Sequence, residues 1–166
     1  EIEDVVSSIE HYGILTGEEQ KATEASSAFI SELNALDKQY SSLKKVSVFY
    51  QVWHSPIVTV NDEQIIGHVI KVCGGSNVFA DLETLTPKVS VEAILASDPE
   101  AIIVSGMDEA RPEWLDDWKQ WAFLKAVKQD NLFFIPPDII QRHTPRVLQG
   151  MRQMCEHLQQ ARDNLN

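Results

Sequence analysis

The chain of 166 residues is short of basic side chains, with 14 Lys and Arg against 25 Asp and Glu and a formal net charge of −11. A nucleic-acid interface needs clustered Lys and Arg to neutralise phosphates, so this balance argues against a nucleic-acid partner. Long apolar runs are missing too, because no stretch approaches the roughly 20 apolar residues of a membrane span. The opening Glu1-Ile2-Glu3-Asp4 lacks the zones of a signal peptide. We therefore expect a segment that starts inside a longer protein and does not cross a membrane.

Catalytic motifs are also missing. The sequence has no Gly-x-Ser-x-Gly elbow, no phosphate-binding glycine loop and no His-Glu-x-x-His helix. Its five histidines are scattered, and no Cys-x-x-Cys pair occurs at the spacing of a zinc site. The sequence therefore predicts neither an enzyme nor a resident metal or cofactor.

Apolar residues make up 43% of the chain, which is enough for one buried core. Residues 1–45 follow a helical pattern that Gly17 interrupts. The second helix, from Glu18 to about Leu43, would span nearly 40 Å and carries an apolar stripe between residues 22 and 40. That length suits a spacer between two bodies, although an ordinary surface helix has the same pattern. The stripe also makes it a candidate surface for dimerisation.

From Val46 onward the pattern alternates between strands and helices. Strands are predicted over 46–52, 101–105 and 132–135, and helices over 65–72, 91–95 and about 144–165, with Asn61 or Asp62 and Ser90 as N-caps. The default solution for this order is an α/β fold, in which a small parallel sheet of three or four strands has helices on both faces.

Several residues with binding chemistry follow the predicted strands. Trp53 and His54 stand where the first strand leaves the sheet, and ligands of open α/β folds bind at the carboxyl ends of strands. Asp138 and Arg142 follow the third strand four residues apart, as either a ligand-binding pair or a simple i, i+4 ion pair.

The two cysteines occupy separate predicted helices. Cys73 ends one helix and Cys155 lies in the last one. A bridge between them would be worth about 4 kcal/mol, but the spacing alone slightly favours two buried thiols of a cytosolic protein.

The chain resembles the cobalamin-binding members of the helical-backbone class of periplasmic binding proteins. The stretches that carry the resemblance are Tyr50-Gln51-Val52-Trp53-His54-Ser55-Pro56, Thr59-Val60-Asn61, Val72-Cys73-Gly74-Gly75-Ser76-Asn77-Val78-Phe79, residues 87–95, residues 98–103 and Arg142-His143-Thr144-Pro145-Arg146. These stretches occur in the family's order at similar spacing, from Val46 to about Leu158.

The resemblance implies two α/β lobes joined by a rigid helix, with a corrinoid held in the cleft and delivered to an ATP-driven (ABC) importer. Residues 1–45 would be the end of the first lobe and the connecting helix, and residues 46–166 the C-terminal lobe. It also implies a Cys73–Cys155 disulfide and a periplasmic location.

The resemblance assigns roles to individual residues. The cleft would be lined by the segment from Val52 through Trp53 and His54 to Val58, and Asp138 and Arg142 would contact the ligand. Glu92 would dock on the permease.

The sequence departs from the family at two cleft positions. Thr86 replaces a tryptophan and Val58 a phenylalanine, and we expect Trp53 to supply the missing aromatic surface. Three alternatives remain. The first is a binder of haem or a ferric siderophore with His54 or His143 as iron ligand. The others are a doubly wound enzyme and a pure interaction module that acts through Glu92.

Overall fold

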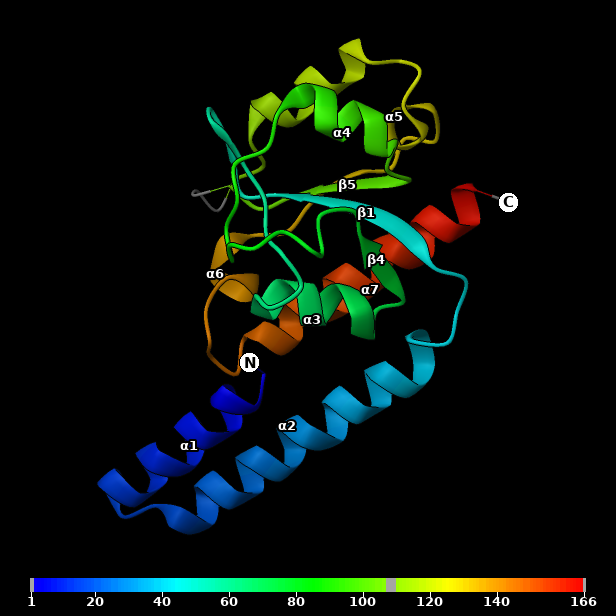
Figure 1. Ribbon diagram of the computed structural model, residues 1–166. Helices are drawn as coiled ribbons and strands as arrows, with labels where there is room; N and C mark the ends of the chain where they lie inside the picture. The colour runs from blue at the N-terminus through cyan, green and yellow to red at the C-terminus, as the bar shows by residue number, and fades with distance from the viewer. Residues whose placement is uncertain (1, 107–109, 166) are drawn as a thin grey trace.

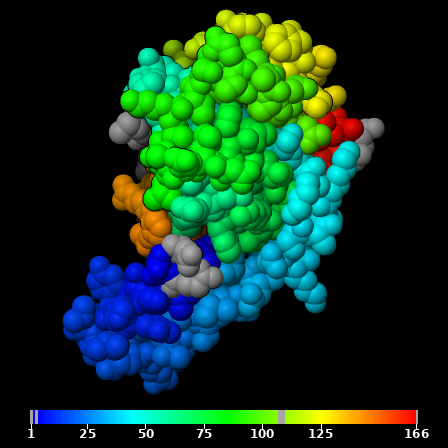
Figure 2. All heavy atoms as spheres, in the orientation of Figure 1, coloured from blue at the N-terminus to red at the C-terminus, as the bar shows by residue number. Residues whose placement is uncertain are grey.

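The computed structural model describes residues 2–106 and 110–165 (Figure 1). Two antiparallel helices come first, α1 (Glu3–Thr16) and α2 (Glu19–Tyr40), and they project from the body that the rest of the chain forms (Figure 2). Gly17 ends α1 in the left-handed conformation, with φ 70°, as a helix-terminating glycine does. The predicted break at this glycine is confirmed. Helix α2 has 22 residues, so it is about 33 Å long.

The body is built on a parallel sheet of four strands in the order β4-β1-β5-β6. The strands are β1 (Val46–Gln51), β4 (Gly75–Asn77), β5 (Ala101–Val104) and β6 (Leu132–Phe134). In register, Val48 of β1 lies beside Asn77 on one side and Ala101 on the other. The predicted α/β class with a small parallel sheet is confirmed.

Helices cover both faces of this sheet (Figure 1). Alternate strand residues face two separate apolar clusters, as the two-residue period of a strand requires. Val48 and Ile103 pack in one cluster with α2, α3 (Ile65–Val72) and α7 (Val147–Asn164). Phe49 and Ile102 pack in the other with α4 (Val91–Ser97), the 3₁₀ helix η1 (Glu113–Gln120) and α5 (Lys125–Lys128). No helix within the described ranges is long and apolar enough to cross a membrane.

Two local predictions at helix starts have different outcomes. The Ser90 side chain accepts a hydrogen bond from the amide of Ala93 and caps α4 as predicted. The prediction of Asn61 or Asp62 as the cap of α3 is wrong, because Gln64 is the N-cap and its side chain accepts from the amide of Ile66. Asn61 instead accepts from the amides of Glu63 and Gln64, which stabilises the turn before the helix.

The apolar stripe of α2 is mostly covered within the chain. Ala22 and Phe29 are buried, while Leu33, Leu36 and Tyr40 pack against the core that α2 shares with α7. The predicted stripe consists of Ala22, Ala25, Phe29, Leu33, Leu36 and Tyr40, and among these residues only Ala25 is exposed. The apolar surface that suggested a dimer through this helix is therefore largely used inside the fold. The assignment of residues 1–45 to a first lobe and a connecting helix stays a prediction.

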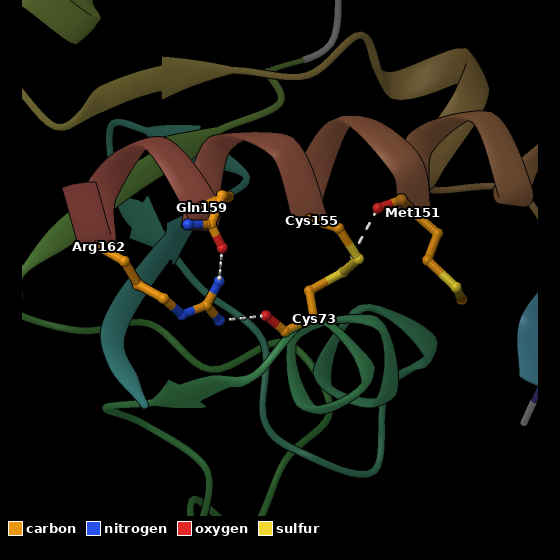
Figure 3. Close-up of a disulfide and its surroundings, with 5 residues drawn as sticks. All are labelled: Cys73, Met151, Cys155, Gln159 and Arg162. Carbon is orange, nitrogen blue, oxygen red and sulfur yellow. Dashed lines mark hydrogen bonds between the residues drawn. A yellow bond between two sulfur atoms is a disulfide. The ribbon is translucent and has the colours of Figure 1, made fainter. Parts of the chain in front are cut away.

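A disulfide joins α3 to α7. Cys73 and Cys155 are bonded, fully buried and 82 residues apart, which confirms the predicted pairing (Figure 3). The side chain of Arg162, about two helical turns further along α7 and only 5% exposed, reinforces the same junction. It donates to the carbonyl oxygen of Cys73 at 2.6 Å, to that of Lys44 at 2.8 Å, and to Gln159 at 3.2 Å. Because Lys44 lies in the short connection between α2 and β1, this arginine fixes that connection to the disulfide junction.

Candidate functional site

The predicted site residues that follow β1 and β6 gather at the carboxyl edge of the sheet. Parallel strands bring their carboxyl ends to one edge, where open α/β folds bind ligands. In Figure 1 this is the left-hand end of the sheet, where a teal hairpin leaves β1 and α6 (Pro137–Ile140) follows β6. Trp53 and His54 belong to the hairpin, and Asp138 belongs to α6.

The hairpin consists of β2 (Trp53–His54) and β3 (Ile57–Val58), joined by a turn with a cis Ser55–Pro56 peptide bond. Trp53 pairs with Val58, and the amide of Val52 donates to the carbonyl of Val58 at 2.8 Å. The indole Nε1 of Trp53 donates to the carbonyl of Ser55 at 3.1 Å. The His54 side chain is exposed at the tip. The hairpin therefore presents two aromatic rings beyond the end of β1.

A buried glutamine at the end of β1 supports the base of the hairpin. Gln51 is the last residue of β1 and is 2% exposed. Its amide nitrogen donates to the carbonyl of Trp53 at 3.1 Å, and its amide oxygen accepts from the indole of Trp118 at 2.8 Å. The chain Trp118–Gln51–Trp53 thus couples η1 to the hairpin.

Trp114 of η1 extends the aromatic surface. Its ring stacks on the His54 imidazole, with centroids 5.2 Å apart and planes 19° from parallel, and His54 also lies 4.9 Å from the Trp53 ring. Trp114 lies 60 residues from His54 in the sequence, so no local pattern indicates their contact.

Asp138 organises a small ionic cluster on the other side of this edge. Its carboxylate binds Arg142 at 3.1 Å and also pairs with Arg146. The Asp138 side chain is only 18% exposed, whereas Arg142 is 68% exposed. The predicted Asp138–Arg142 pair is therefore present as an i, i+4 ion pair, with Arg146 as a third member that the sequence did not indicate. The cluster offers spare guanidinium donors outward.

Helix α6 is held closely in place. Gly150 of α7 has no Cβ, and a Cβ there would collide with the carbonyl oxygen of Ile139. The side chain of Gln141, just after α6, donates to the carbonyl of Gly106 beyond β5 at 3.1 Å. Beneath it, Tyr50 is fully buried, and burial raises the pKa of its phenol, which keeps the ring neutral. The edge is thus a fixed framework under the ionic cluster.

Thr86 is exposed in the segment that runs beside the hairpin base. The amide of Thr59 donates to the carbonyl of Pro87, and Val58 forms a bridge with Lys88. Thr86 thus lies two residues from the bridge between Lys88 and Val58. The structure brings these two departures from the family pattern close to each other.

His143 lies in a different setting from His54. It lines a hollow of about 350 Å³ between α1, α2 and the segment after α6. Glu92, the predicted docking residue, is exposed in the first turn of α4, where free backbone amides stabilise a carboxylate.

Comparison with known proteins decides the family. The model of the periplasmic binding protein family matches residues 1–139. The chain belongs to the periplasmic binding protein family. This membership confirms the predicted periplasmic location and the resemblance found in the sequence.

Individual relatives of this periplasmic binding protein carry a common name. A vitamin B12-binding protein of Vibrio parahaemolyticus is 33% identical over 164 residues, 97% of this chain and 58% of the relative. One from Salmonella choleraesuis is 32% identical over 165 residues, 96% of this chain and 58% of the relative. The chain thus spans somewhat more than half the length of the curated relatives it matches.

Solved structures agree on the fold. The periplasmic vitamin B12 binding protein BtuF of Vibrio cholerae superposes with a TM-score of 0.85 at 30% identity, covering 97% of this chain and 62% of that one. The periplasmic heme-binding protein RhuT from Roseiflexus has a TM-score of 0.83 at 14% identity, covering 96% and 64%. At that identity the second likeness concerns the fold alone.

Proposed function

We propose that this chain belongs to a binding protein that captures cobalamin or a related corrinoid in the periplasm and delivers it to an ABC importer. The observation that carries the proposal is the similarity, over 97% of the chain, to proteins named vitamin B12-binding. The geometry supports it, because Trp53, His54, Asp138 and Arg142 stand at one edge of the sheet. Capture would be binding without catalysis, and no cofactor would be consumed.

The two parts of this edge suit the two kinds of surface on a corrinoid. The hairpin and Trp114 offer aromatic faces that lose water favourably against an apolar ring system. Arg142 and Arg146 offer N–H donors to the amide oxygens at the ring's periphery. Asp138 holds both guanidinium groups, so its role would be to orient them.

The proposal is tested by calorimetric titration of cyanocobalamin into the protein at its full encoded length. We expect submicromolar binding that Arg142→Ala weakens about tenfold or more, since a charged hydrogen bond contributes about 1.5–3 kcal/mol. Asp138→Ala should weaken it as well. The matched control is Lys125→Ala, which removes an exposed cation paired with Asp98 on the other face of the sheet. Absence of cyanocobalamin binding would refute the assignment, and a Soret shift on titration with haem would then support the alternative ligand.

Docking on a permease is a separate part of the proposal. Glu92 is exposed, and Ser90 caps its helix, so the carboxylate is held outward on a fixed support. We expect Glu92→Arg to abolish co-purification with the permease while leaving corrinoid affinity unchanged. The control is Glu83→Arg, which reverses the charge of an exposed acid on a loop. Retained binding of the Glu92 variant to the permease would contradict this role.

A further inference from the structure

We propose that Trp114 and His54 form a stacking subsite that selects corrinoids with a flat heteroaromatic nucleotide base over corrinoids that lack one. The inference rests on the proposed corrinoid function and assigns Trp114 as a residue that determines specificity. The observation behind it is a group of three adjacent rings at the carboxyl edge, in which Trp114 stacks on His54 and the Trp53 ring lies 4.9 Å from His54 at an interplanar angle of 55°.

The stack is arranged before any ligand arrives. The Trp53 indole N–H is used within the hairpin, and the buried Gln51 joins the hairpin to η1 through Trp118. The Trp53 ring and the hairpin therefore have little freedom to lose when a ligand binds, which favours affinity. His54 is exposed at the tip of the hairpin, so burial does not impose its contact with Trp114.

Two hollows are lined by both His54 and Trp114. One of about 370 Å³ is lined by Trp53, His54, Trp114, Pro112 and Arg111, and one of about 170 Å³ is lined by His54, Trp114, Trp118 and Trp121 among others. The larger volume is at the small end of the range for drug-sized ligands, about 300–1,000 Å³. It suits one planar arm of a large ligand better than an entire macrocycle with its fringe of amides.

The chemistry of corrinoids supplies such an arm. A complete corrinoid carries a flat, bicyclic heteroaromatic base on its nucleotide loop, whereas a cobinamide has the same macrocycle without the base. Stacking of a base on an aromatic side chain depends on the π face and little on the pattern of hydrogen bonds. The Trp114 subsite would therefore act on the base, while Asp138 and Arg142 would act on the macrocycle that both ligands share.

The test compares cyanocobalamin with dicyanocobinamide by calorimetry on the protein at its full encoded length. We expect the unsubstituted protein to bind cyanocobalamin more tightly, and Trp114→Ala to weaken cyanocobalamin about tenfold while changing dicyanocobinamide by less than about twofold. Trp114→Phe should restore most of the preference. Phe123→Ala, which removes an aromatic ring that is 56% exposed and lines neither hollow, is the control and should change neither affinity.

The other possible outcomes would overturn either the subsite alone or the proposed function as well. Equal weakening of both ligands by Trp114→Ala, or no weakening of either, would overturn the subsite while leaving corrinoid capture intact. Failure of the unsubstituted protein to bind either ligand would refute the proposed function itself, and the subsite with it. If Trp114→Ala does not fold by circular dichroism, His54→Ala at the exposed hairpin tip serves instead, and the same loss of preference is expected.

Discussion

Loss of the Cys73–Cys155 disulfide should destabilise the chain by about 4.5 kcal/mol. The bond closes a loop with a sequence separation of 82, and the chain-entropy relation for a loop of that length gives about 15 cal/mol/K, or about 4.5 kcal/mol at 25 °C. The effect arises mainly in the unfolded state, which becomes free to expand. For a domain of this size each kcal/mol lowers Tm by about 2–4 °C, so the expected drop is about 9–18 °C.

Urea unfolding of the oxidised and reduced protein, followed by circular dichroism, measures this difference directly. Both cysteines are fully buried, so the protein has to be reduced while unfolded and refolded in reductant before the second titration. The m-value should also increase on reduction, because an unfolded chain without the cross-link exposes more surface. The matched control is Cys73→Ala/Cys155→Ala, whose unfolding should not depend on reductant.

A small effect would refute the reasoning. If reduction lowers the free energy of unfolding by less than about 1 kcal/mol with an unchanged m-value, the reduced unfolded chain stays as restricted as the cross-linked one. Dependence of the double-alanine variant on reductant would instead reveal that the reductant acts elsewhere.

Two further predictions concern α7. Arg162→Ala should lower the free energy of unfolding by about 2–4 kcal/mol in urea titrations, because it leaves the carbonyls of Lys44 and Cys73 without their charged donor. The control, Arg152→Ala at an exposed position of the same helix, should lower the free energy of unfolding much less. Equal losses in the two variants would contradict the role of Arg162 at the junction. His157 stacks on Phe133 and bonds the carbonyl of Phe134, and burial lowers the pKa of its imidazole. Its neutral form is therefore favoured in the folded state, so its contribution to stability is present above the unfolded pKa of about 6.5 and is lost as the pH falls below it. A His157→Gln variant should show a smaller loss of stability between pH 7.5 and pH 5 than the unsubstituted protein, and identical pH profiles would disprove the role.

The strands that the sequence predicted are those with a strong local signal. β1, β5 and β6 are rich in β-branched and aromatic residues, and all three form where expected. β4 was not assigned, because Gly75, Ser76 and Asn77 have weak strand preference. The pairing of β4 with β1 depends on close packing at Gly75, because a Cβ there would lie 2.9 Å from Leu158. Gly75 and Leu158 are far apart in the sequence, so no local pattern predicts this contact.

The candidate site was predictable in part for the same reason. Trp53 and His54 directly follow a strand, so topology alone placed them at the ligand-binding edge. Trp114 and Arg146 were missed, because their places depend on how η1 and the segment after α6 fold back. Asp138 and Arg142 were predicted as either a ligand-binding pair or a simple i, i+4 ion pair. These two interpretations do not exclude each other, because the ion pair also holds Arg142 at the edge of the sheet.

The net charge of the chain favours a corrinoid over haem or a ferric siderophore as the ligand. At −11, the protein repels anions at long range, and haem and many ferric siderophores carry negative charge, whereas cyanocobalamin is neutral overall. The local cluster of Asp138, Arg142 and Arg146 has a net charge of +1, too little to offset that field beyond the roughly 8 Å over which charges act in physiological salt. We therefore expect the association rate of cyanocobalamin, measured by stopped-flow fluorescence, to change less than about twofold between 0.02 and 0.5 M salt. A steep dependence would show that charge attraction brings the ligand to this edge, and the neutral corrinoid would then be the wrong choice.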